Sequence, residues 1–240
     1  MPLRPRREPL LRHSGRNLVL ALLGFLLQRW LQQPLVTPLA RQVEAHNLGL
    51  LRQRPLRRLP QGLQTFLALL LLDYTIYLWH VLLHRVPLLW RFHLVHHADL
   101  DLDSSTALRF HAGELLCSIP YRLAQIRLLG IAPGSLALWQ KLFFGSVVFH
   151  HANLRLSDWL DRWLSPLLMT PRLHGIHHST DPADSDANFS AGLTLWDRLH
   201  RSLRGHGSQI KIGVADFQQP AEVSLGKLLT LPFGRVPPAL

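Results

Sequence analysis

The chain has 240 residues, of which 48% are hydrophobic and 17% are charged, whereas an average soluble domain has roughly 25% charged residues. Its single cysteine excludes an intramolecular disulfide framework and any cysteine-rich zinc or iron–sulfur site. The net charge is +11, and the arginines gather beside apolar segments, as in membrane proteins. We expect no nucleic-acid binding, because no basic stripe is interleaved with aromatic residues.

The N-terminal part combines a basic run with a first apolar stretch, Leu18 to Val36. Residues 1–27 imitate the charged and apolar regions of a signal peptide, but no small-residue cleavage site follows them. In its place stand Gln28, Arg29 and Trp30. We therefore predict an uncleaved anchor that spans a membrane obliquely or lies partly at its interface. Three prolines should break any long helix over residues 37–60, namely Pro38, Pro55 and Pro60.

The second apolar stretch, Gly62 to Leu83, is long enough to cross the hydrocarbon core of a bilayer, which is about 30 Å thick. Its one acidic residue, Asp73, is costly in lipid and should face the protein interior. A third helix is predicted over residues 113–129, kinked at Pro120, and a fourth over residues 136–151. Neither passes as a lone span on hydropathy.

The remaining segments are predicted to cap this bundle. Residues 157–168 have apolar side chains at helical spacing with charges between them, which suits a helix lying in the membrane surface. Residues 181–189 are predicted as a polar loop, and the tail from residue 205 as irregular. The predicted fold is all-α, a membrane bundle of about four transmembrane or membrane-embedded helices capped by a surface helical domain with a dimetal site. Its parts are a membrane-associated N-terminus with linker (1–60), a catalytic domain (61–204) and a tail (205–240).

Eight histidines in three clusters are the most informative feature of the sequence. They form one HxxxH pattern (His80, His84) and two HxxHH patterns (His93, His96, His97; His174, His177, His178). Residues three and four apart share a helix face, so each cluster directs its imidazoles to one place. One metal seldom uses more than about four to six protein ligands. Eight histidines therefore predict two metals, and the repeated HxxHH is compatible with a pseudo-symmetric site.

The clusters should meet at one face of the membrane, because one ends the long span and the others adjoin polar segments. Nitrogen ligands that hold two adjacent redox metals make a site able to bind and split dioxygen, and imidazole suits iron. Zinc binds the same ligands and can replace iron. An apolar interior beneath the site would hold an acyl chain or sterol against the metals.

The histidines lie in longer runs that resemble the fatty acid hydroxylase/sterol desaturase superfamily over roughly residues 65–200. The runs are LDYTIYLWHVLLHR (72–85), LWRFHLVHHADLDLDSSTALRFHAGE (89–114), FHHANLRL (149–156) and TPRLHGIHHS (170–179), then Asn188, Phe189 and LWDRL (195–199). The resemblance implies an integral-membrane di-iron oxygenase that hydroxylates or desaturates a lipid. It would use O₂ and electrons from an external ferredoxin- or cytochrome-type donor.

By that resemblance the eight clustered histidines are the catalytic metal ligands. A further ligand is expected from residues 150–153, where His150 or His151 is favoured and Asn153 is an outer or water-mediated contact. His111 either lines the site or is a hydrogen-bonded histidine at a helix start. Four residues either orient ligand imidazoles or serve as helix caps or surface groups: Asp99, Asp103, Asn188 and Asp197.

The chain departs from the superfamily after LWDRL, where Phe-Gly-Thr is usual and His200, Arg201 and Ser202 stand instead. This leaves the packing of the last helix open, but not the metal cage. His200 and His206 are interpreted as surface residues. Three tryptophans are interpreted as core or interface aromatics: Trp79, Trp90 and Trp196.

Two other functions fit part of the pattern. A metal transporter would place its ligands near the bilayer midplane with acidic partners, whereas these clusters lie at span ends. A structural zinc protein without catalysis would need fewer ligands. The predicted location is a bacterial inner membrane, with the metal site facing the cytoplasm. The sequence does not identify the lipid substrate, which is a sterol, a fatty acid, a sphingolipid or a carotenoid.

Overall fold

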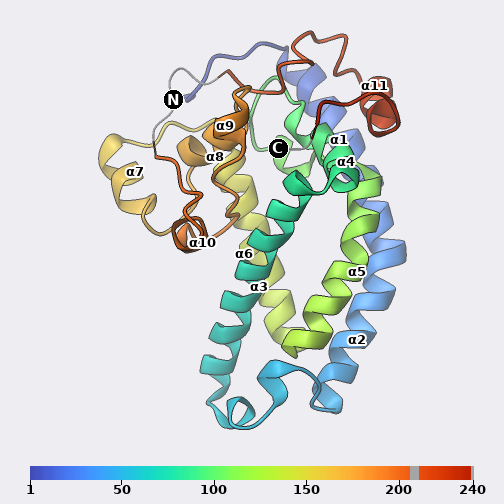
Figure 1. Ribbon diagram of the computed structural model, residues 1–240, viewed down its shortest axis with the longest axis vertical. Coiled ribbons are helices and arrows are strands. Elements are labelled where there is room, and N and C mark those ends of the chain that lie inside the picture. The colour runs from blue at the N-terminus through green and yellow to red at the C-terminus, as the bar shows by residue number, and fades with distance from the viewer. Residues whose placement is uncertain (206–210, 239–240) are drawn as a thin grey trace.

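The structure is a computed structural model that describes residues 1–205 and 211–238. In those residues, long helical rods form an elongated bundle and shorter helices gather at one end of it (Figure 1). The same residues form no β-sheet and contain isolated bridges alone, Leu168 with Leu193 and Ser179 with Ile212. The prediction of an all-α fold is therefore confirmed.

The first rod is continuous and longer than predicted. It consists of α1 (Leu10–Leu27), a π-helical segment η1 (Gln28–Gln32) and α2 (Gln33–Ala45). The predicted break at Pro38 is wrong, because Pro38 lies inside α2. The buried face of α2, which includes Val36 and Val43, packs in the bundle core and offsets the one backbone hydrogen bond that the proline removes.

The other rods follow the predicted segments closely. They are α3 (Gln61–Arg85), α5 (Ala112–Leu129) and α6 (Pro133–His151). The loop between α2 and α3, with η2 (Leu50–Arg52) and η3 (Leu56–Arg58), closes the far end of the bundle (Figure 1). Gly130, at a φ of +79°, ends α5 in the left-handed conformation that favours glycine.

Two segments of the described chain are long and apolar enough to cross a membrane, Leu10–Arg52 and Gln61–Arg85. The predicted four-helix membrane bundle is therefore supported for two rods on length and composition. Asp73, inside the second segment, faces the protein as predicted. Its carboxylate accepts hydrogen bonds from the Leu193 amide (3.0 Å) and the Trp196 indole (2.7 Å).

The capping helices are short. They are α4 (Pro87–His97), η4 (Thr106–Leu108), α7 (Asp158–Leu164), α8 (Pro171–His177), α9 (Pro182–Ser185), α10 (Leu195–Leu199), α11 (Leu225–Thr230) and η5 (Leu231–Phe233). The surface helix predicted over residues 157–168 ends at Leu164, two residues before Pro166, which has no amide hydrogen to continue the helical hydrogen bonds. The predicted loop contains α9, and the tail predicted as irregular contains α11, whose Leu228 is fully buried. His206 lies outside the described residues.

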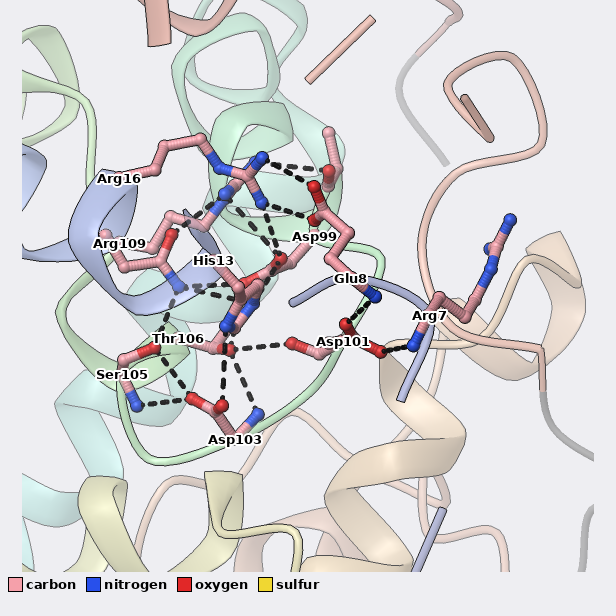
Figure 2. A network of polar contacts seen from close by, with 12 residues as sticks. Arg7, Glu8, His13, Arg16, Asp99, Asp101, Asp103, Ser105, Thr106 and Arg109 are labelled. Carbon is pink, nitrogen blue, oxygen red and sulfur yellow. Dashed lines mark hydrogen bonds and ion pairs between the residues drawn. The ribbon is translucent and has the colours of Figure 1, made fainter. Parts of the chain in front are cut away.

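A buried polar network joins the N-terminal residues to the loop after α4 (Figure 2). The Asp99 carboxylate contacts the His13 imidazole at 2.8 Å and accepts a hydrogen bond from Thr106 at 2.9 Å. The guanidinium groups of Arg16 and Arg109 each lie 3.6 Å from it. Burial by itself would raise the pKa of Asp99, but Arg109 and His13 hold it well below its usual range. Asp99 is thus an ionised anchor in the interior.

The residues before α1 add to this attachment. The backbone amides of Arg7 and Glu8 each donate to the Asp101 carboxylate at 2.8 Å. The Glu8 carboxylate in turn pairs with the Arg16 guanidinium at 2.7 Å. The N-terminal segment therefore packs on the loop that follows the second histidine cluster (Figure 2).

We expect Asp99→Ala to lower the free energy of unfolding by about 3–5 kcal/mol, because it leaves buried cations without their carboxylate. Denaturant-induced unfolding in detergent micelles measures the change. Asp216→Ala, which removes an exposed carboxylate, is the matched control and should leave stability unchanged. Equal stability of the two variants would show that the network contributes nothing.

Candidate metal centre

Nine of the ten histidines predicted as ligands converge at the capped end of the bundle in two groups. Within each group the ligand nitrogens lie within 4.8 Å of one another. The first group is His80, His84, His93, His97 and His177, and the second is His96, His151, His174 and His178. The groups adjoin, since the rings of His97 and His178 stack with centroids 4.5 Å apart. All nine are buried except His80, which is half-buried.

Each HxxHH motif contributes to both groups. On α4, His93 and His97 belong to the first group and His96 to the second. At the end of α8 the assignment is exchanged, with His174 and the following residue His178 in the second group and His177 in the first. Residues four apart lie about 40° apart around a helix, whereas adjacent residues lie about 100° apart. Each motif therefore supplies two histidines to one group and one histidine to the other. The group that receives two from the first motif receives one from the second.

The spacing of the nitrogens fits ligands of a transition metal. In the first group, Nε2 of His84 lies 3.1 Å from Nε2 of His97. In the second group, Nε2 of His151 lies 3.2 Å from Nε2 of His96 and 3.1 Å from Nε2 of His174. Two nitrogens that each lie about 2.0–2.1 Å from one ion are about 3 Å apart when they subtend a right angle.

Backbone carbonyls fix the tautomers of several rings. Nδ1 of His80 donates to the Phe189 carbonyl and Nδ1 of His177 to the Ala187 carbonyl, both at 2.7 Å. With the proton on Nδ1, Nε2 presents its lone pair. Nε2 of both rings is buried and has no hydrogen-bond partner. A bound metal ion would satisfy these nitrogens, so the donor set fits a metal.

Among the described residues, Glu114 on α5 is the carboxylate that contacts a clustered imidazole. Its Oε2 accepts a hydrogen bond from Nδ1 of His93 at 3.1 Å, and Nε2 of His93 is buried without a partner. Our sequence analysis missed this role. The available signal was an acidic residue in the first turn of an apolar helix, which is costly to bury unless it has a partner.

The four acceptors proposed to orient the imidazoles bond elsewhere. Asp99 and Asp103 both contact His13. The Asn188 amide donates to the Leu173 carbonyl at 2.9 Å, and Asp197 accepts from the amides of Phe189 and Ser190, both at 2.9 Å. In the described residues, these four side chains stabilise loops through hydrogen bonds. The imidazole rings are oriented by backbone carbonyls and by Glu114.

The other candidates from the sequence are His150, His151, Asn153 and His111, and among them His151 alone belongs to one of the two groups. His151 rather than His150 supplies the α6 nitrogen, because adjacent residues on a helix point in different directions. The His150 ring instead packs 4.1 Å from that of His174. Asn153 accepts from the backbone amide of Arg4 at 2.8 Å and so holds the N-terminal segment. His111 caps α5 by accepting from the Gly113 amide at 2.9 Å, which confirms the helix-start interpretation.

The departure from the superfamily after LWDRL is accommodated by local contacts. The Ser202 hydroxyl donates to the Asp197 carboxylate at 2.7 Å. His200 is exposed, as predicted, and its ring stacks on Tyr77 with centroids 5.0 Å apart. The three tryptophans interpreted as core residues are all buried: Trp79, Trp90 and Trp196.

A cavity of about 510 Å³ extends from the histidines into the bundle. Its wall between the rods is largely apolar and includes Ile76, Trp79, Leu83, Phe143 and Val147. Phe25 on α1 and Phe144 on α6 also line it, yet they are 61% and 57% exposed. The cavity wall therefore reaches the apolar outer surface of the bundle.

Burial keeps the clustered imidazoles of the cap neutral, as metal ligands must be. Burial lowers the pKa values of five of them well below the usual range, and neighbouring imidazoles lower these values further. The five are His96, His97, His174, His177 and His178.

Comparison with known proteins agrees with this geometry. The profile of the fatty acid hydroxylase family matches residues 65–202, more than half of the chain, and the chain belongs to this family. It is 32% identical over 143 residues to ornithine lipid hydroxylase OlsE of Rhizobium tropici (58% of this chain, 41% of that protein). It is 25% identical over 154 residues to human alkylglycerol monooxygenase (61% and 32%) and 28% identical over 145 residues to human cholesterol 25-hydroxylase (57% and 50%). The matches thus span half or less of these relatives. No solved structure matches the chain.

We expect the iron-loaded protein to contain two metal ions per chain, one for each histidine group. His97→Ala and His178→Ala each remove one nitrogen, from the first and the second group respectively, and each should lower the content by about one ion. His150→Ala and the exposed His46→Ala are controls that should retain both ions. Inductively coupled plasma mass spectrometry measures the content. Two ions in every variant would refute the ligand assignment.

For the metal-free protein, we expect stability to fall as the pH drops below 6.5, the ordinary pKa of histidine. Below this pH the unfolded chain binds protons on imidazoles that stay neutral in the folded protein, so acid favours unfolding. The contribution is complete above 6.5 and is lost progressively toward the lowered folded pKa. Unfolding temperatures of chelator-treated protein at about pH 7.5 and about pH 5.5 measure it. Equal temperatures would contradict the buried neutral state.

Proposed function

We propose that the protein is a membrane-bound di-iron oxygenase that hydroxylates a C–H bond of a lipid. The observation that carries this proposal is a pair of adjoining groups of buried imidazoles at one end of a largely apolar cavity. Family membership supports it, as do relatives named as hydroxylases and monooxygenases. Those names also count against a metal transporter or a structural zinc protein.

Each histidine group would hold one iron ion, and the two ions would supply the reductive activation of O₂. Hydroxylation converts R–H, O₂, two electrons and two protons into R–OH and water. An external ferredoxin- or cytochrome-type donor would provide the electrons. Desaturation consumes the same reductant and yields an alkene and two waters. Zinc can occupy the same nitrogens without redox activity.

The chain's own residues position the reactants. The carbonyls of Phe189 and Ala187 and the carboxylate of Glu114 hold the rings in one tautomer. The apolar cavity holds a hydrocarbon against the histidines and excludes water, which lowers the entropic cost of the reaction.

The membrane would enclose the rods and leave the cap at one surface. On α7, Trp159 and Trp163 are 68% and 65% exposed, which suits a helix at the membrane interface. We propose that the cap and its histidines face the cytoplasm of a bacterial inner membrane, where the external electron donor would reach them.

We expect iron-loaded protein in lipid nanodiscs, given a reductant, to consume O₂ and to insert one oxygen atom into a lipid. Mass spectrometry after reaction under ¹⁸O₂ detects the label. His93→Ala should abolish labelling, and Glu114→Gln should reduce it by about 10–100-fold, because the partner of His93 is weakened. His46→Ala is the control that should keep full activity. Absence of labelled product from fully iron-loaded wild type, across a total lipid extract, would overturn the proposal.

A further inference from the structure

The cavity contains an arginine that the oxidation chemistry does not use. Arg122 lies on α5 in the cavity wall. Its Nε is buried and has no hydrogen-bond partner, and its guanidinium carbon lies 5.5 Å from the centre of the Trp139 ring. Among the described residues that line the cavity, it is the one with a fixed positive charge, and the carboxylate there, Glu114, is bound to His93.

Arg122 is half-buried and has no carboxylate partner among the described residues, and its Nε is buried without a hydrogen bond. This arrangement is costly inside a largely apolar bundle, since burial of a charge is tolerated when a counter-ion accompanies it. The face of Trp139 compensates for part of this cost but is a weaker partner than an anion. If this position had a purely structural role, an apolar residue would fill it at lower cost. Arg122 is therefore suited to a ligand that brings the negative charge.

The distance between Arg122 and the histidines follows from the helices that carry them. Arg122 follows Glu114 by eight residues on α5, and Trp139 precedes His150 by eleven residues on α6. At about 1.5 Å per residue these separations are about 12 Å and about 16 Å. Arg122 and Trp139 are thus carried by parts of α5 and α6 that lie several turns away from the residues of the candidate metal centre.

Amide side chains accompany Arg122 in the cavity wall. They are Gln28, Gln32, Gln33 and Gln140. The first two belong to the π-helical segment η1, a backbone form that is rare and frequent at functional sites. Each amide offers N–H donors to an acceptor held by Arg122. The cavity therefore has a metal-facing end and a separate polar end, with apolar wall between them.

Resting on the function proposed above, we infer that Arg122 binds the oxyanion head group, carboxylate or phosphate, of a single-chain lipid substrate. Planar guanidinium matches both oxyanions. A cavity of about 510 Å³ falls in the range of sites for one small ligand. The hydrocarbon chain extends from Arg122 toward the histidines.

The test compares three probes with the same hydrocarbon chain: palmitate, hexadecyl phosphate and the uncharged hexadecanol. Equilibrium binding of each radiolabelled probe is measured to the full-length protein in nanodiscs, with protein-free nanodiscs as background. At least one anionic probe should bind the wild type about tenfold or more tightly than hexadecanol. Preference for palmitate identifies a carboxylate site, preference for hexadecyl phosphate a phosphate site, and equal preference a general oxyanion site.

The variants assign the preference to Arg122. Arg122→Gln should lose the tenfold preference while its affinity for hexadecanol is unchanged, and Arg122→Lys should recover part of it. Arg127→Gln, which removes an exposed arginine from the same helix, is the matched control and should behave as wild type. The metal content of each variant, measured in parallel, reports whether the fold is intact.

The inference is overturned if the wild type binds all three probes equally, or if Arg122→Gln binds the anionic probes as tightly as wild type. Should Arg122→Gln fail to fold, the comparison among probes on the wild type and on Arg122→Lys still decides the question. Binding needs no turnover, so anion preference together with no labelled product in the ¹⁸O₂ experiment would refute the proposed function and leave the head-group site standing.

Discussion

The candidate metal centre depends on keeping buried imidazoles neutral and fixed in one tautomer. A ring whose Nδ1 proton is donated to a carbonyl can offer its Nε2 lone pair in one direction alone. The acceptors come from separate segments, including the carbonyls of Ala187 and Phe189 in the cap, Val147 on α6 and Arg109 before α5. Correct orientation of the rings thus requires all these segments to be packed. The loops of the cap are under the same constraint as the helices that bear the histidines.

The sequence predicts the helices and the convergence of the clusters because both follow from periodicity. It does not predict which atoms orient the rings. A carbonyl is present at every residue, so Phe189 and Ala187 carry no compositional signal for this role, whereas carboxylates such as Asp99 and Asp197 attract attention and bond elsewhere. The choice between His150 and His151 depends on the rotation of α6 against α8, which tertiary packing decides.

The N-terminus shows a second limit of sequence reasoning. Its arginines are typical of the flank of a membrane anchor, and charge counting treats them as exposed. In the structure Arg16 is buried, pairs with Glu8 and lies beside Asp99 (Figure 2). Residues far apart in the sequence supply the partners, so local composition cannot reveal the network. Residues 1–60, predicted as a separate membrane-associated part, contact the loop next to the candidate metal centre through this network.

The same N-terminal rod lines one wall of the cavity, although it lies outside the family region that carries the histidines. The family profile covers residues 65–202, which include all nine grouped histidines. One wall of the cavity precedes that region and comes from α1, η1 and the start of α2, with Gly24, Phe25 and Gln32 among its residues. In the proposed function, oxidation would require a C–H bond held beside the metals, and this wall would determine which C–H bond is held there. A shared set of histidines would then serve lipids with different head groups, because other residues set the polarity of the opposite end of the cavity.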